Sequence, residues 1–164
     1  MESVETIIPD NEGNHLVVVL SFYEDNDKVG TFQIPPEFSE LDIADIAITK
    51  LYLDMPLNLS AFFKMCHWLI DQFTIFPNAV FSFICSTDPL ETHHSDMASE
   101  QYRWSLFEYF YQRNIPKLTA MGIESKDIIV GPEGYQTFAR VFYRIKHAPI
   151  IHLVIEHLSN KYSF

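Results

Sequence analysis

The sequence predicts an α+β domain built on a mixed β-sheet, and three observations carry this prediction. The chain has 164 residues, of which 48% are hydrophobic and 15% aromatic, enough to fill one core. Runs rich in β-branched residues alternate with runs whose apolar residues recur every three or four positions. One nearly continuous apolar run lies mid-chain, as in a strand buried on both sheet faces. We therefore expect a single domain over residues 15–164, after a flexible segment over residues 1–14.

Three strands are predicted first. The run HLVVVLSFY over residues 15–23 is rich in strand formers, and residues 29–34 resume this pattern after the turn EDNDK. The two runs predict a β-hairpin, and Pro35 and Pro36 end its second strand. Residues 43–53, IADIAITKLYL, predict the third strand.

A helix and a central strand follow. Asn58 or Ser60 caps a helix that reaches Phe73, because its apolar residues recur at spacings of three and four. Pro77 then breaks the helix. Residues 79–85 predict a strand at the centre of the sheet, parallel to its neighbour.

The last third of the chain predicts a helix, two paired strands and a final helix. The first helix runs from Asp96 to Arg113 and carries aromatic residues on two faces, which either pack between layers or contact a partner. The remaining predicted elements are strands over residues 117–124 and 136–146 and a helix over residues 148–160.

Charge is unevenly distributed. The net charge of −11 divides into −14 over residues 1–102 and +3 over residues 103–164. An acidic protein repels phosphate backbones, so we expect no nucleic-acid binding. The basic residues of the second part either form one anion-accepting face or are scattered. No run of about 18 apolar residues and no basic leader is found, so we expect a cytoplasmic protein with no membrane contact.

The predicted element order, β-β-β-α-β-α-β-β-α, resembles the core of the GNAT (acyl-CoA N-acyltransferase) fold from its second strand onward. The resemblance covers residues 15–146. The chain is also similar to an uncharacterised bacterial domain family without assigned activity, in which a strand ending in an Ile-Cys-like pair leads to an Arg-x-x-Leu-Phe helix. The matching residues here are Ile84, Cys85, Arg103, Leu106 and Phe107.

The GNAT resemblance implies acyl-CoA chemistry that this chain matches poorly. The family holds the CoA pyrophosphate with a Gln/Arg-x-x-Gly-x-Gly/Ala loop, whereas residues 54–60 contain neither glycine nor arginine. Many members use a tyrosine on the next helix as general acid. The aligned pair here is Leu106 and Phe107, with Tyr109 and Tyr111 nearby. The scaffold is therefore expected without the usual chemistry.

Several residues are candidates for a site. The catalytic candidates are Cys85, Ser86, His93 and Tyr109, because a thiol or hydroxyl near a histidine or tyrosine supports nucleophilic or acid–base chemistry. Arg103 and Arg140 are the candidates for binding a cofactor's phosphates. His93 belongs to a histidine pair that diverges on a short loop, so no metal site is expected.

These observations favour a non-catalytic, cytoplasmic interaction or regulatory domain without a cofactor, which binds a protein partner through an aromatic or acidic surface. The alternative is an acyl-CoA-dependent N-acyltransferase with an atypical cofactor site. A third hypothesis is that the acidic first part mimics a nucleic acid, which requires its carboxylates on one face.

Overall fold

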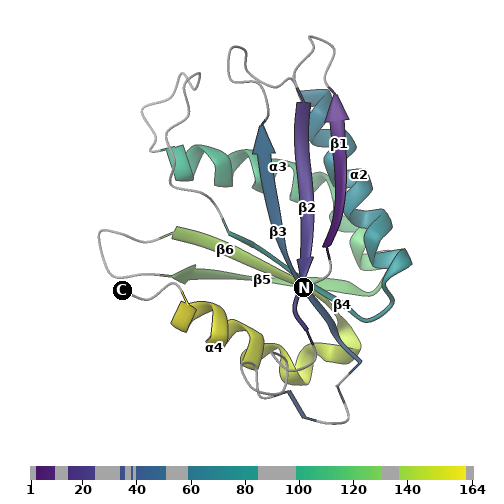
Figure 1. Cartoon of the computed structure of the whole chain (residues 1–164), viewed down its shortest axis with the longest axis vertical. Helices are drawn as coiled ribbons and strands as arrows, with labels where there is room; N and C mark the ends of the chain where they lie inside the picture. Colours follow the sequence, from purple (N-terminus) through teal and green to yellow (C-terminus); the bar gives the residue numbers. More distant parts are fainter. Residues whose placement is uncertain are drawn as a thin grey trace.

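The computed structural model describes residues 3–9, 15–24, 34–35, 38, 40–50, 59–84, 99–130 and 137–161. These residues form six strands, three α-helices and a short 3-10 helix around one mixed sheet (Figure 1). The elements, in chain order, are β1 (Ser3–Pro9), β2 (His15–Phe22), β3 (Asp42–Lys50), α2 (Leu59–Ile75), β4 (Ala79–Ile84), α3 (Ser99–Ala120), β5 (Ile123–Val130), β6 (Thr137–Arg144), η2 (Ile145–Ile150) and α4 (Ile151–Lys161).

The sheet has the strand order β1-β2-β3-β4-β6-β5. Strands β1, β2 and β3 pair antiparallel, β3 and β4 pair parallel, and β6 pairs antiparallel with both β4 and β5. The α+β class and the mixed sheet are therefore confirmed, as is the parallel neighbour of β4. The central position of β4 is also confirmed, because Ala79, Val80 and Phe81 are at most 1% exposed.

Residues 29–33 of the predicted hairpin lie outside the described residues, and their predicted pairing with residues 15–23 was wrong. Strand β2 has β1 on one side and β3 on the other, so neither of its edges is open to a further strand. The sequence pattern of residues 1–14 indicates a flexible segment, whereas the structure places residues 3–9 in β1. Strand β1 forms because Val4 and Ile8 lie opposite Leu20 and Leu16 of β2 and pack against the core.

Helix α3 is longer than predicted, and the strand predicted over residues 117–124 was misplaced. The helix passes through Pro116 and buries Leu118 in the core, which is only 6% exposed. It ends where Gly122 adopts a φ of +73°, a left-handed conformation that glycine adopts without steric cost. Strand β5 then begins at Ile123.

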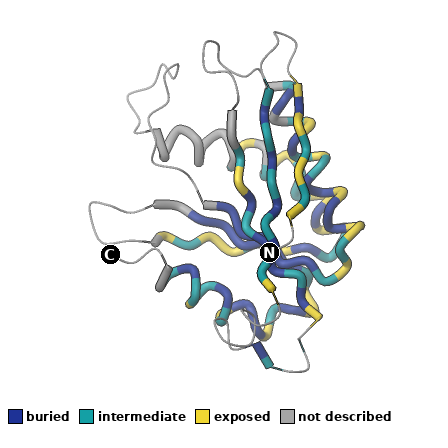
Figure 2. The backbone as a smooth tube through the Cα atoms, viewed as in Figure 1, coloured by how far each residue is buried: buried dark blue, intermediate teal, exposed yellow. Residues whose placement is uncertain are grey.

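Helices cover the sheet from both sides. Helices α2 and α3 pack on one face, where the ring centroids of Phe73 and Phe81 lie 4.6 Å apart (Figure 1). Helix α4 packs on the other face through Ile151, Val154 and Leu158, each at most 1% exposed. Burial is deepest in the central strands and lower along the outer strands β1 and β5 (Figure 2). No helix in these ranges is long and apolar enough to cross a bilayer.

Candidate functional site

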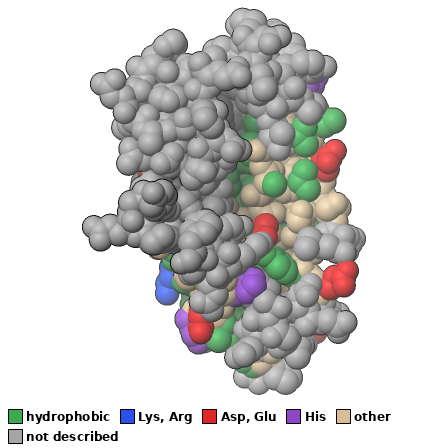
Figure 3. All heavy atoms as spheres, turned by 60° about the vertical axis from the view of Figure 1, so that its left-hand side comes forward, with side chains coloured by type: hydrophobic (Ala, Val, Ile, Leu, Met, Phe, Trp, Pro, Cys, Tyr) green, Lys and Arg blue, Asp and Glu red, His purple; other side chains and the backbone are tan. Residues whose placement is uncertain are grey.

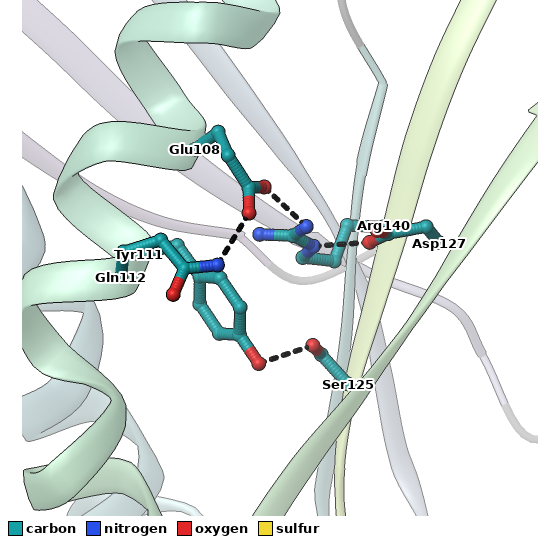
Figure 4. Close-up of polar contacts among 6 residues, drawn as sticks. All are labelled: Glu108, Tyr111, Gln112, Ser125, Asp127 and Arg140. Atoms are coloured by element: carbon teal, nitrogen blue, oxygen red, sulfur yellow. Dashed lines mark hydrogen bonds and ion pairs between the residues drawn. The ribbon is translucent and has the colours of Figure 1, made fainter.

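The most densely connected polar site described lies between α3 and the strands β5 and β6, with Arg140 at its centre (Figure 4). Arg140 stands in a row of paired residues that crosses the sheet from Ile46 through Phe83 to Arg140 and Asp127. Residues paired in this way point to the same face, which here is the face covered by α2 and α3. The sheet therefore holds a guanidinium in an otherwise largely apolar layer, where it is only 2% exposed.

Two carboxylates neutralise this buried cation. Arg140 Nη2 donates to Glu108 Oε2 of α3, and Arg140 Nε donates to Asp127 Oδ1 of β5. Burial alone lowers the pKa of Arg140, but the hydrogen bonds and charges of Asp127 and Glu108 outweigh it and raise the pKa above its ordinary value. Arg140 is therefore a permanent cation that joins the helix to the outer strand.

An aromatic ring and two further hydrogen bonds complete the cluster. The guanidinium carbon of Arg140 lies 3.9 Å from the centroid of the Tyr111 ring, a stacked cation–π contact. The Tyr111 hydroxyl oxygen accepts a hydrogen bond from Ser125 Oγ at 2.7 Å, and Gln112 Nε2 donates to Glu108 Oε1 at 2.7 Å. Figure 4 shows that these side chains converge from α3 and β5 onto Arg140. The arrangement fixes each member of the cluster in a defined orientation.

The sequence made Arg140 a candidate for binding the phosphates of a cofactor, and its surroundings in the fold can be compared with that role. A phosphate there would have to displace Glu108 or Asp127 and reach a side chain that is nearly inaccessible to solvent. The geometry instead suits a residue that positions α3 on the sheet. The second cofactor candidate, Arg103, lies in α3, but its side chain is outside the described residues.

Tyr109, a catalytic candidate, lies on the outer surface of α3, where it is 47% exposed. Its hydroxyl oxygen accepts a hydrogen bond from Arg113 Nη1 at 3.0 Å. The Arg113 guanidinium carbon lies 5.7 Å from the centroid of the Tyr109 ring and 4.9 Å from that of Phe63 on α2. Tyr109 is therefore part of a surface patch, separate from the cluster at Arg140. The other catalytic candidates, Cys85, Ser86 and His93, lie outside the described residues.

A second polar cluster lies on the opposite face of the sheet and was not anticipated. Asp45 of β3 accepts hydrogen bonds from the Tyr23 hydroxyl at 2.7 Å and from Ser82 Oγ of β4 at 2.6 Å. Asp45 and Ser82 are paired residues one step before the last pair of the parallel contact, Ile46 and Phe83. Strand β3 continues to Lys50 beyond that pair, and Figure 1 shows β3 diverging there from the strands on the far side of the sheet.

The strand sequences themselves indicate these clusters, because a charged or polar residue interrupts an otherwise apolar strand face. Arg140 and Phe142 share a face of β6, so an arginine at that position needed counter-charges. Asp45 and Ser82 similarly interrupt apolar strands. The partners could not be found from sequence, because Glu108 lies 32 residues from Arg140 and Ser82 lies 37 residues from Asp45.

The described basic residues lie on several elements, and Arg113 and Lys117 share a face of α3. Arg140 is buried, Arg144 donates to the carbonyl oxygens of Phe73 and Phe76, and Lys126 lies on β5. On the face drawn in Figure 3, the acidic side chains that the structure describes stand apart from one another, which gives no support to a nucleic-acid mimic.

Metal-ligating and thiol groups offer no additional centre in the described ranges. No three side chains of His, Cys, Asp or Glu gather there as a metal site would require. Cys66 is a free thiol on α2 that lines a small apolar cavity of about 40 Å³ between the sheet and helices α2 and α3. Burial raises the pKa of the Cys66 thiol to about 12, so it behaves as a core residue.

Comparison of the chain with protein-family models, with curated proteins and with solved structures finds no match, so the chain's own residues are the basis for any functional assignment.

Proposed function

We propose that this chain is a non-catalytic interaction domain on a GNAT-like sheet, and that it binds a protein partner through the surface of α2 and α3. The proposed surface, called the aromatic–basic patch, consists of Phe63, Tyr109, Arg113 and Lys117. The parallel contact of β3 with β4 within an otherwise antiparallel sheet supports the GNAT-like description.

The contacts of Arg113 carry the proposal. Its guanidinium lies near two aromatic rings and donates a hydrogen bond to the Tyr109 hydroxyl, so its orientation is set before any partner arrives. Exposed tyrosine and arginine side chains are the residues most enriched in the energetic centres of protein interfaces. A side chain that is already ordered loses less conformational entropy on binding. The patch therefore has the composition and the preorganisation of a binding surface.

The charge of the patch indicates the chemistry of its partner. Tyr109, Arg113 and Lys117 are spaced four residues apart on α3, so they form one exposed stripe along the helix. This stripe is basic although the whole chain carries a net charge of −11. An acidic segment bearing an aromatic or aliphatic side chain complements it, because carboxylates pair with Arg113 and Lys117 while the apolar group packs on Tyr109.

Site-specific photo-crosslinking tests the proposal. A photoreactive phenylalanine analogue replaces Tyr109 in cells that naturally produce the protein, and Thr74, an exposed residue on α2, serves as the matched control position. We expect a discrete adduct from position 109 that is absent from position 74, and that disappears in an Arg113→Ala background. Identical adducts from both positions, or no adduct from position 109, would contradict the proposal.

The acyltransferase alternative rests on a different observation. The parallel contact of β3 with β4 ends at Ile46 and Phe83, while β3 continues to Lys50. The separation of the two strands beyond that pair supports the alternative, in which an acyl-CoA substrate would bind at this end of the sheet. A thermal-shift titration separates the two functions, because a ligand that binds the native state must raise its melting temperature. A rise at about 1 mM CoA or acetyl-CoA supports the acyltransferase, and an unchanged melting temperature supports the interaction domain.

A further inference from the structure

An open cavity of about 290 Å³ lies where η2 follows β6. Its lining comes from three segments that are distant in sequence, and it consists of Phe38, Glu40, Leu41, Asn78, Lys146 and His147. At about 30 Å³ per water molecule, the volume corresponds to about ten waters, which is near the lower bound for small-molecule sites.

The side of this cavity that carries Lys146 is suited to an anion. Lys146 Nζ donates to Asn78 Oδ1 at 3.2 Å, and this contact directs the Asn78 side chain toward the lysine. The ammonium group has three donors, so the contact with Asn78 leaves others for a ligand. The neighbouring Arg144 is engaged with the carbonyl oxygens at the end of α2, but its charge adds to the positive potential of this corner.

His147 places a buried imidazole ring in the lining of the cavity. It is only 6% exposed, and its Nδ1 atom has no hydrogen-bond partner within the described part of the chain. Burial, followed by the charges of Lys146 and Arg144, lowers the pKa of His147, so the ring is neutral at neutral pH. Lys146 and Glu40 are therefore the charged groups of the lining, and their charges are opposite. A balanced lining of this kind suits a monoanion better than a dianion such as phosphate.

We infer that this cavity binds a small organic carboxylate with an apolar body and a hydrogen-bond donor beside the carboxylate. The carboxylate pairs with Lys146, the apolar body packs against Phe38 and Leu41, and the donor faces Glu40. Hydroxy acids and amino acids share this chemistry. The inference is independent of the proposed partner surface, because Phe63, Tyr109, Arg113 and Lys117 do not line the cavity.

Calorimetric titration of the full chain tests the inference. The probes are 3-phenyllactate and phenylalanine, which distinguish a hydroxyl from an ammonium donor, with the uncharged amide of phenyllactate as the ligand control. Lys146→Met removes the charge and keeps most of the aliphatic stem. Lys64→Met, at an exposed lysine of α2 outside both the cavity and the aromatic–basic patch, is the matched protein control.

We expect saturable binding of at least one acid below about 20 mM, weakened at least about tenfold by Lys146→Met and unchanged by Lys64→Met. The amide is expected not to bind. Equal loss in both lysine variants, equal binding of the amide, or no saturation by either acid overturns the inference.

Discussion

Removal of both carboxylates around Arg140 is the perturbation that most directly tests the buried cluster. In the double variant Glu108→Gln with Asp127→Asn, side-chain volumes are nearly unchanged. The guanidinium, only 2% exposed, keeps its charge and loses both counter-charges. Leaving a buried charge without a partner costs about 3–5 kcal/mol. We expect the free energy of unfolding to fall by an amount in this range.

The single variants set the comparison, because each leaves one carboxylate on Arg140. The Asp127 side chain is 57% exposed and the Glu108 side chain 32% exposed, so solvent screens Asp127 more strongly. We expect Asp127→Asn to cost about 0.5–1 kcal/mol and Glu108→Gln about 1–2 kcal/mol. The double variant should then exceed the sum of the singles by at least about 1 kcal/mol, as coupled groups do.

Urea unfolding followed by circular dichroism measures these differences. Glu156→Gln, at an exposed position of α4, is the control and is expected to change stability by less than about 0.5 kcal/mol. Additivity of the two single variants within about 0.5 kcal/mol would refute the reasoning, because the carboxylates would then not share one buried charge.

Three further predictions concern single residues. The pKa of His147 in the folded chain lies below its ordinary value of 6.5, so protonation of the ring favours the unfolded chain. The contribution of the neutral ring to stability is therefore complete above pH 6.5 and is lost as the pH falls through the lowered pKa. Urea midpoints measured between neutral and acidic pH should therefore decline less steeply in His147→Gln than in the natural chain, and parallel declines would contradict this role. Alkylation of Cys66 at mildly basic pH, followed by peptide mass spectrometry, should be about a thousandfold slower in the folded than in the unfolded chain, because burial raises the thiol pKa from 9.0 to about 12; comparable rates would show that the thiol is accessible. Gly122→Ala should lower the free energy of unfolding by about 1 kcal/mol, because alanine is strained at a φ of +73° while no atom lies within 4 Å of the added methyl group; an unchanged urea midpoint would show that the backbone relaxes there.

Sequence patterns identified elements whose stability is local. Helix α2 and strand β4 were predicted close to their observed bounds, because helical spacing and a continuous apolar run are each typical of a single structure. Strand β1 was missed because its exposed face carries Ser3 and Glu5, so the short segment shows little hydrophobic bias. Its stability depends on pairing with β2, which only the folded sheet provides.

The candidate site likewise contains residues that a local sequence pattern indicates and residues whose role depends on the folded chain. The sequence made Arg140 a candidate for binding an anion, and the structure shows it buried between two carboxylates. The contribution of Glu108 depends on how α3 crosses the sheet, and no local pattern determines that crossing. The exposed stripe on α3 is a local pattern, since it follows from helical spacing alone.

The parallel contact between β3 and β4 divides the sheet into two antiparallel groups, β1-β2-β3 and β4-β6-β5. Five residue pairs and the hydrogen bond from Ser82 to Asp45 join these groups. A change in the angle between the groups would therefore strain this one boundary and leave every antiparallel ladder intact. The Ser82–Asp45 hydrogen bond is a side-chain contact that spans this boundary.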